Sequence, residues 1–186
     1  MPEPVRATAI LDYWLDEVGE KGWYLADPDR DAEIAHRFAD DHAAACAGRL
    51  RDWLTAPRSA LALLVLLDQF SRNLYRGSAR AYQADPLALK IMVAAIRVGH
   101  DKQIAKPARQ FFYLPLMHSE RLADQERCVR LFLMDHPTEA ENNLEHAIKH
   151  REVIRRFGRF PSRNAAMGRA DSEAERAYRA ADGYMS

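Results

Sequence analysis

Residues 60–77 read ALALLVLLDQFSRNLYRG and contain the longest apolar run of this 186-residue chain. The run 60–67 is apolar on every side of a helix, so we expect a central, buried helix over 58–74. Asp68 follows the run directly, where a lone carboxylate would be costly to bury. It therefore needs a partner, and the stretch RRFGRFPSRN over 155–164 is rich in guanidinium groups.

The remaining segments also show helical periodicity, and no stretch alternates strictly enough to suggest a strand. Asp27-Pro28 and Asp85-Pro86 predict helix N-caps with proline in the first turn, and Ser172-x-x-Glu175 predicts a capping box. We predict helices over 6–18, 29–47, 49–54, 58–74, 86–99, 107–113, 116–134, 139–157 and 173–181. The predicted fold class is all-α, with about eight or nine helices in antiparallel hairpins. We expect a single domain over 1–186, with residues 1–5 and 182–186 loosely held.

Charge and hydropathy argue against nucleic-acid and membrane partners. The formal net charge is zero, whereas proteins that coat nucleic acid or anionic membranes carry a basic excess. The longest apolar run is too short to span a bilayer, and the N-terminus lacks the pattern of a signal peptide. We therefore expect a soluble, cytoplasmic protein with neither nucleic-acid nor membrane partners. Cys46 and Cys128 form no C-x-x-C pair, and we expect both to be small, buried apolar residues.

Two predicted helices carry polar residues near their apolar faces. In 116–134, residues 118, 122, 125, 129 and 132 share one face, so His118 and Gln125 should point inward beside Leu122. Glu120 lies on the opposite side and is expected to be solvated. In 139–157, His150 borders the apolar face.

These polar groups have two interpretations. In the first, Asp68 binds an arginine such as Arg159 or Arg163, or pairs with Arg72 within its own helix, and the network serves the fold alone. In the second, the arginines hold a small anionic metabolite, a carboxylate or phosphate, and a histidine moves a proton. The predicted anion-binding residues are Asp68, Arg72, Asn73, Arg159, Arg163 and Asn164, and the catalytic candidates are His118 and His150.

Several other kinds of site are not expected. His146 and His150 have the spacing of two metal ligands on a helix, but position 147 is alanine rather than the glutamate of H-E-x-x-H. No P-loop, G-x-S-x-G or G-x-G-x-x-G is present. We therefore predict neither a metal site nor a cofactor, and enzymatic activity is less expected than binding.

Four stretches resemble a bacterial family called domain of unknown function 924. They read LDYW at 11–14, LDQFSRNLYRG at 67–77, FYLPLMHSE at 112–120 and RFGRFPSRN at 156–164, and Gly168-Arg169 fits as well. Met117 and Ser162 depart from the family pattern, where we expect glutamate and histidine. The resemblance implies an all-helical fold similar to the tetratricopeptide-like superfamily.

The resemblance assigns no activity. The function expected first is a binding or interaction module of helical-hairpin type with a protein or peptide partner. The alternatives are an enzyme or binder for a small anionic metabolite and a polar cluster that is purely structural. The sequence does not determine the oligomeric state.

Overall fold

The computed structural model describes residues 3–134, 141–181 and 183–184. Its secondary structure is helical, with no strand among the described residues, which confirms the predicted all-α class. The chain forms two compact units. Unit 1 comprises Met1–Arg76 and Arg80–Phe112, and unit 2 comprises Gly77–Ala79 and Tyr113–Ser186. The expected single domain and the tetratricopeptide-like arrangement both stay predictions.

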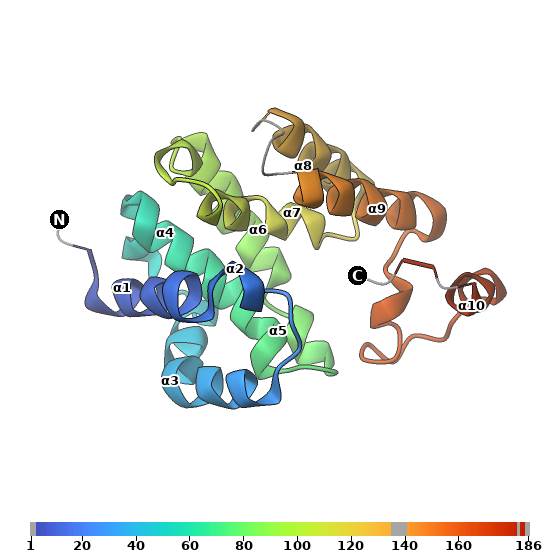
Figure 1. The fold of residues 1–186 in the computed structure, drawn as a ribbon, viewed down its shortest axis with the longest axis horizontal. Helices are drawn as coiled ribbons and strands as arrows, with labels where there is room; N and C mark the ends of the chain where they lie inside the picture. Colours follow the sequence, from blue (N-terminus) through green and yellow to red (C-terminus); the bar gives the residue numbers. More distant parts are fainter. Residues whose placement is uncertain (1–2, 135–140, 182, 185–186) are drawn as a thin grey trace. The chain divides into compact units, whose positions relative to one another are not determined.

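Unit 1 holds six α-helices joined by short π-helical and 3₁₀ segments (Figure 1). The α-helices are α1 (Val5–Leu11), α2 (Gly19–Gly22), α3 (Pro28–Cys46), α4 (Pro57–Leu64), α5 (Ser71–Leu74) and α6 (Asp85–Arg97). The π-helical segments are Asp12–Val18 and Val65–Phe70. The 3₁₀ segments are Arg51–Thr55, Ala79–Tyr82, Asp101–Gln103 and Ala108–Phe112.

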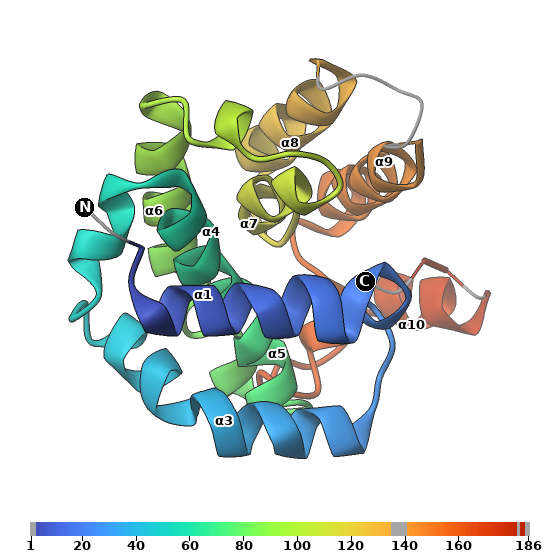
Figure 2. The ribbon, with the colours of Figure 1, turned by 60° about the vertical axis from the view of Figure 1, so that its left-hand side comes forward.

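The predicted central helix is confirmed as a continuous rod of α4, the segment Val65–Phe70 and α5. Every residue from Ser59 to Ser71 is buried. Helices α1, α3 and α6 pack around the rod, as Figure 2 shows. Aromatic rings fill the space between them at centroid distances of 5.2 to 6.2 Å, contributed by Tyr13, Trp14, Phe38, Phe70 and Phe111.

Unit 2 holds α7 (Leu114–Met117), α8 (Leu122–Met134), α9 (Glu141–Phe157) and α10 (Glu173–Ala180), with a 3₁₀ turn at Pro161–Arg163. Helices α8 and α9 pack side by side (Figure 2). The capping box that starts α10 at Ser172 is confirmed, as is the N-cap of α3 at Asp27. Asp85 instead lies inside the first turn of α6, after its cap residue Ala84.

The predicted continuous helix over 116–134 is wrong. Helix α7 ends at Met117 and α8 begins at Leu122, because the chain turns at His118 to Arg121. This break leaves Leu122 43% exposed at the helix start rather than in the buried stripe. Gln125 is buried as predicted, and its Nε2 donates to the carbonyls of Met117 and Ser119 at 2.7 and 2.6 Å.

Of the terminal residues expected to be loose, 1–2, 182 and 185–186 lie outside the described part of the chain. Within the described part, Arg58 donates to Glu3 at 2.9 Å. At the other end, the Tyr184 hydroxyl lies 2.7 Å from His146 Nδ1. None of the helices in the described ranges is long and apolar enough to cross a membrane.

Candidate functional site

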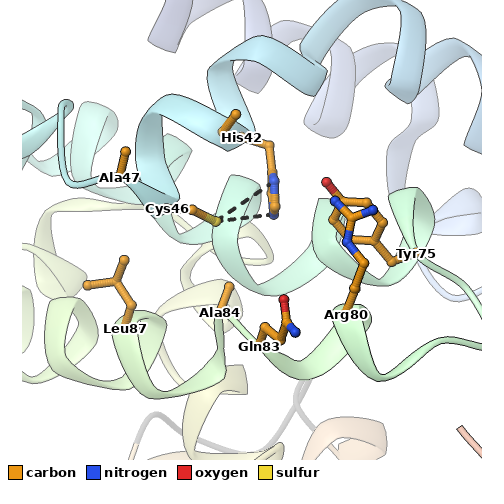
Figure 3. A pocket seen from close by; sticks show the side chains of 9 residues that line it. His42, Cys46, Ala47, Tyr75, Arg80, Gln83, Ala84 and Leu87 are labelled. Atoms are coloured by element: carbon orange, nitrogen blue, oxygen red, sulfur yellow. Dashed lines mark hydrogen bonds between the residues drawn. The ribbon is translucent and has the colours of Figure 1, made fainter.

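A pocket of about 500 Å³ lies in unit 1 between the second half of α3 and the start of α6 (Figure 3). Small-molecule sites typically measure about 300–1,000 Å³, so this volume suits a small ligand. The small side chains of α3 and of Ala84, the cap residue before α6, leave the space open. The lining residues are His42, Ala43, Cys46, Ala47, Tyr75, Arg80, Gln83, Ala84 and Leu87.

His42 is held in one orientation at the pocket wall. Ser71 Oγ donates to the Leu67 carbonyl at 2.7 Å, so it accepts from His42 Nε2 at 2.8 Å. This pattern assigns the proton to Nε2 and leaves Nδ1 as an acceptor. Burial, together with the positive charge of Arg80, lowers the pKa of His42. The imidazole is therefore neutral near pH 7.

Cys46 lies one helical turn after His42, and its Sγ is 3.7 and 3.8 Å from the two ring nitrogens. The prediction that Cys46 is buried is wrong, because this face of α3 borders the pocket and leaves the residue exposed. Cys128 is buried as predicted. Desolvation raises the pKa of the Cys46 thiol, so a neutral thiol faces a neutral imidazole. An activated cysteine needs the thiolate, and this pair does not supply it.

Arg80 is the positively charged residue of the pocket wall. Its guanidinium carbon lies 3.9 Å from the centroid of the Tyr75 ring, which is stacking distance for a cation on an aromatic face. Figure 3 shows the Arg80 and Tyr75 side chains one against the other, with Gln83 beside them. Among the described residues that line this pocket, none is a carboxylate.

The predicted site residues of unit 1 are engaged within the fold. Asp68 is 1% exposed and accepts from Gln69 Nε2 at 2.5 Å. Arg72 Nη2 donates to Asp85 Oδ2 at 2.9 Å, and its Nη1 donates to the carbonyl of Ala81. Asn73 donates to Asp31, on α3, at 2.8 Å. These contacts tie α5 to the elements before and after it.

The predicted site residues of unit 2 are also engaged. Arg159 donates to both carboxylate oxygens of Glu175, at 2.6 and 2.7 Å. This guanidinium holds the pKa of Glu175 well below its usual range. Arg163 is 7% exposed and its guanidinium carbon lies 4.5 Å from the Phe160 ring centroid. The predicted pairing of Asp68 with these arginines stays a prediction, because Asp68 belongs to unit 1.

Glu120 is the centre of a second ion-pair network in unit 2, which the sequence analysis missed. Its two oxygens accept from Arg169 at 2.7 and 2.9 Å and from the Phe160 backbone N–H at 2.8 Å. Arg169 also donates to Asn164 Oδ1 at 2.9 Å, and Asn164 donates to Asp171 at 2.7 Å. Burial raises the pKa of Glu120, but these donors outweigh it and hold the pKa below its usual value. The prediction that Glu120 is solvated is therefore wrong.

The two catalytic candidates, His118 and His150, lie in unit 2. His150 is 6% exposed, donates from Nδ1 to the His146 carbonyl at 2.8 Å, and contacts the rings of Phe160 and Tyr184. Burial lowers the pKa of His150 to about 3, and the nearby His118 adds to this effect. Efficient acid–base catalysis needs a pKa near the working pH, so these values favour a structural role for His150.

The structure therefore brings together a different set of residues from the predicted one. His42 and Cys46 face the pocket because they lie four apart on α3, and Arg80 reaches it from the 3₁₀ turn after Gly77. The i,i+4 spacing of His42 and Cys46 is visible in the sequence. The turn that folds Arg80 back onto Tyr75 is not. Within the described ranges, no group of three or more histidine, cysteine or acidic side chains has the arrangement of a metal site.

Comparisons with known proteins place the chain in a family. A search of the curated proteins found no match. A solved structure, described as a protein of unknown function, ATU0120, from Agrobacterium tumefaciens, is 41% identical. The similarity covers 93% of this chain and 96% of that one, with a TM-score of 0.87. The model of a family described as bacterial protein of unknown function (DUF924) matches residues 10–183. The chain belongs to this family, as its sequence motifs predicted.

Proposed function

We propose that this chain is a binding protein for a small organic anion and that the pocket of unit 1 is the binding site. The observation that carries the proposal is the composition of the pocket wall. Arg80 brings a full positive charge, Gln83 and Tyr75 bring further polar groups, and no carboxylate lines the described wall. A guanidinium binds carboxylates and phosphates through paired N–H groups.

Two arginines of unit 2 already hold carboxylates of that unit. Arg159 and Arg169 each place two nitrogens on a carboxylate of their own unit. An external anion would have to displace these carboxylates, which are partly or wholly buried. The anion site expected at Arg159, Arg163 and Asn164 is therefore less favoured than the pocket beside Arg80.

Binding is favoured over catalysis at this pocket. The nucleophile that the wall offers is Cys46, and desolvation raises its pKa and disfavours the reactive thiolate. The lowered pKa of His42 leaves it without the positive charge that would stabilise a thiolate beside it. His42 Nε2 is also engaged by Ser71. We place this activity in the cytoplasm, where the two free cysteines would remain reduced.

The test is a binding titration of the purified protein with acetate, hexanoate and inorganic phosphate, followed by thermal shift and calorimetry. A ligand at 100 times its Kd stabilises by about 2.7 kcal/mol. We expect at least one anion to bind, and Arg80→Gln to weaken it by roughly tenfold or more. The matched control is Arg97→Gln, an exposed arginine on α6 that does not line the pocket.

Two results would contradict the proposal. One is the absence of any shift with all three anions. The other is an equal loss of affinity in Arg80→Gln and Arg97→Gln, which would indicate a nonspecific effect of charge.

A second proposal retains the interaction module expected from the helical hairpins. It is supported by exposed apolar side chains on α8, where Leu122, Leu133 and Met134 are 43%, 57% and 74% exposed. Leu133 and Met134 are adjacent at the end of α8, and contiguous exposed apolar surface is typical of a site that meets a partner. Light scattering tests self-association: Leu133→Glu should reduce the measured mass if α8 binds a second copy. An unchanged monomer mass in both proteins would remove self-association through α8.

A further inference from the structure

The pocket of unit 1 has two chemically different ends (Figure 3). His42, Tyr75, Arg80 and Gln83 lie at one end, and Ala47 and Leu87 lie at the other. Cys46 and Ala84 lie between them. A ligand that fills the whole pocket therefore meets a polar, positively charged wall and an apolar wall.

We propose that the natural ligand is an amphiphilic anion, with its carboxylate or phosphate at Arg80 and a short apolar tail between Cys46, Ala47 and Leu87. This inference rests on the proposed function and names the ligand class of the same site. The volume of about 500 Å³ limits the ligand to small-molecule size.

The polar end sets the position of the head group. Arg80 is held against the Tyr75 ring at 3.9 Å, and a guanidinium on a ring face presents its N–H groups around its edge. Gln83 adds an amide that can donate to the same anion. His42 Nδ1 is an acceptor and offers no hydrogen bond to a carboxylate oxygen, so Arg80 and Gln83 are the residues that would hold the head group.

The apolar end selects against a second charge. Ala47, Ala84 and Leu87 offer no hydrogen-bonding side chain, and the described wall carries no second cation. A carboxylate placed there would lose hydration without gaining a partner. The pocket should therefore prefer a monocarboxylate to a dicarboxylate of the same chain length.

The experiment compares acetate, hexanoate and adipate by calorimetry. Each buried methylene should tighten binding by roughly fourfold, so hexanoate should bind far more tightly than acetate. Adipate should bind on the order of tenfold more weakly than hexanoate. Leu87→Asn should weaken hexanoate more than acetate, because only the tail reaches this residue.

Alkylation of Cys46 provides a second readout. Cys128 is buried and its pKa is raised by burial, so Cys46 is the thiol that iodoacetamide reaches first. Saturating hexanoate should slow the alkylation of Cys46 by roughly fivefold or more, whereas saturating acetate should leave the rate nearly unchanged. Peptide mapping assigns the modified cysteine.

The outcomes separate this inference from the proposed function. Equal affinities for acetate and hexanoate, or for adipate and hexanoate, would overturn the amphiphilic ligand and leave the anion-binding pocket standing. Hexanoate binding without protection of Cys46 would overturn the orientation of the tail. Binding of inorganic phosphate alone would overturn the amphiphilic ligand, and if neither phosphate nor any of these carboxylates binds, the proposed function fails as well.

Discussion

The ion-paired arginines of unit 2 contrast with Arg80, which stacks on an aromatic ring at the pocket of unit 1. In unit 2, Arg159 and Arg169 place their guanidinium groups on Glu175 and Glu120, and the carboxylates also accept backbone N–H groups. In unit 1, Arg80 lies on the ring of Tyr75 beside a pocket whose described wall holds no carboxylate. Arg159 and Arg169 hold unit 2 together, and under the proposed function Arg80 would meet a ligand.

The contrast predicts where mutations will cost stability. Glu120→Ala should lower the free energy of unfolding by about 2–3 kcal/mol, because it strips charged hydrogen bonds from Arg169 and the Phe160 N–H. Urea unfolding followed by circular dichroism measures the change. It is the largest effect that we predict for a single residue of either region.

Glu126→Ala, on α8, is the matched control. Its partner Arg151 lies 3.6 Å away, and the Glu126 side chain is 41% exposed, so the cost should stay below about 1 kcal/mol. Equal costs for the two variants would mean that the Glu120 network is no more structural than a surface ion pair.

His150 should make the stability of the protein depend on pH. Its pKa is lowered by burial to about 3 in the folded protein, against about 6.5 in an unfolded chain. The unfolded state therefore takes up the proton first, so stability is full above about pH 6.5 and falls as the pH drops below it. Between pH 8 and pH 5 the loss should be about 2 kcal/mol.

The His146 carbonyl accepts from His150 Nδ1 and raises its pKa, whereas burial and the side chains of His118, Arg163 and His146 lower it. His150→Asn should remove about 2 kcal/mol of the loss between pH 8 and pH 5, whereas His36→Asn, at an exposed position on α3, should keep it. The range stays above pH 5 because Glu120 and Glu175, whose pKa values are lowered, lose their stabilising charge in more acidic solution. An unchanged pH dependence in His150→Asn would assign the effect to other groups.

The sequence predicted the fold class because its signal is local. The run before Asp68 is apolar all round, and a helix with that pattern has to be buried. The break between Met117 and Leu122 could not be predicted from the same kind of pattern, since residues 118, 122 and 125 fit a helical face by spacing alone. The same error gave the wrong environment for Glu120. This residue lies in the turn between α7 and α8, where it accepts a hydrogen bond from the Phe160 N–H.

The candidate site was less predictable. Clustered arginines predict an anion site. Whether each arginine already pairs with a carboxylate of its own unit depends on contacts between residues far apart in the chain. Arg169 and Glu120 are 49 positions apart. The pocket is lined by residues from separate segments, among them His42, Arg80 and Leu87. The periodicity of a single segment does not predict that these residues lie close together.

Among the variants proposed, Arg80→Gln should have the smallest effect on stability. Arg80 is exposed, and its stacking on Tyr75 is worth about 0.5–1 kcal/mol at such a site; the glutamine can keep part of that contact. We expect the free energy of unfolding to change by about 0.5 kcal/mol or less in urea titrations. A loss comparable with that of Glu120→Ala would make Arg80 a structural arginine like Arg159 and Arg169. A near-silent change in stability, measured on the same protein that loses anion binding, would mark Arg80 as a residue kept for its ligand.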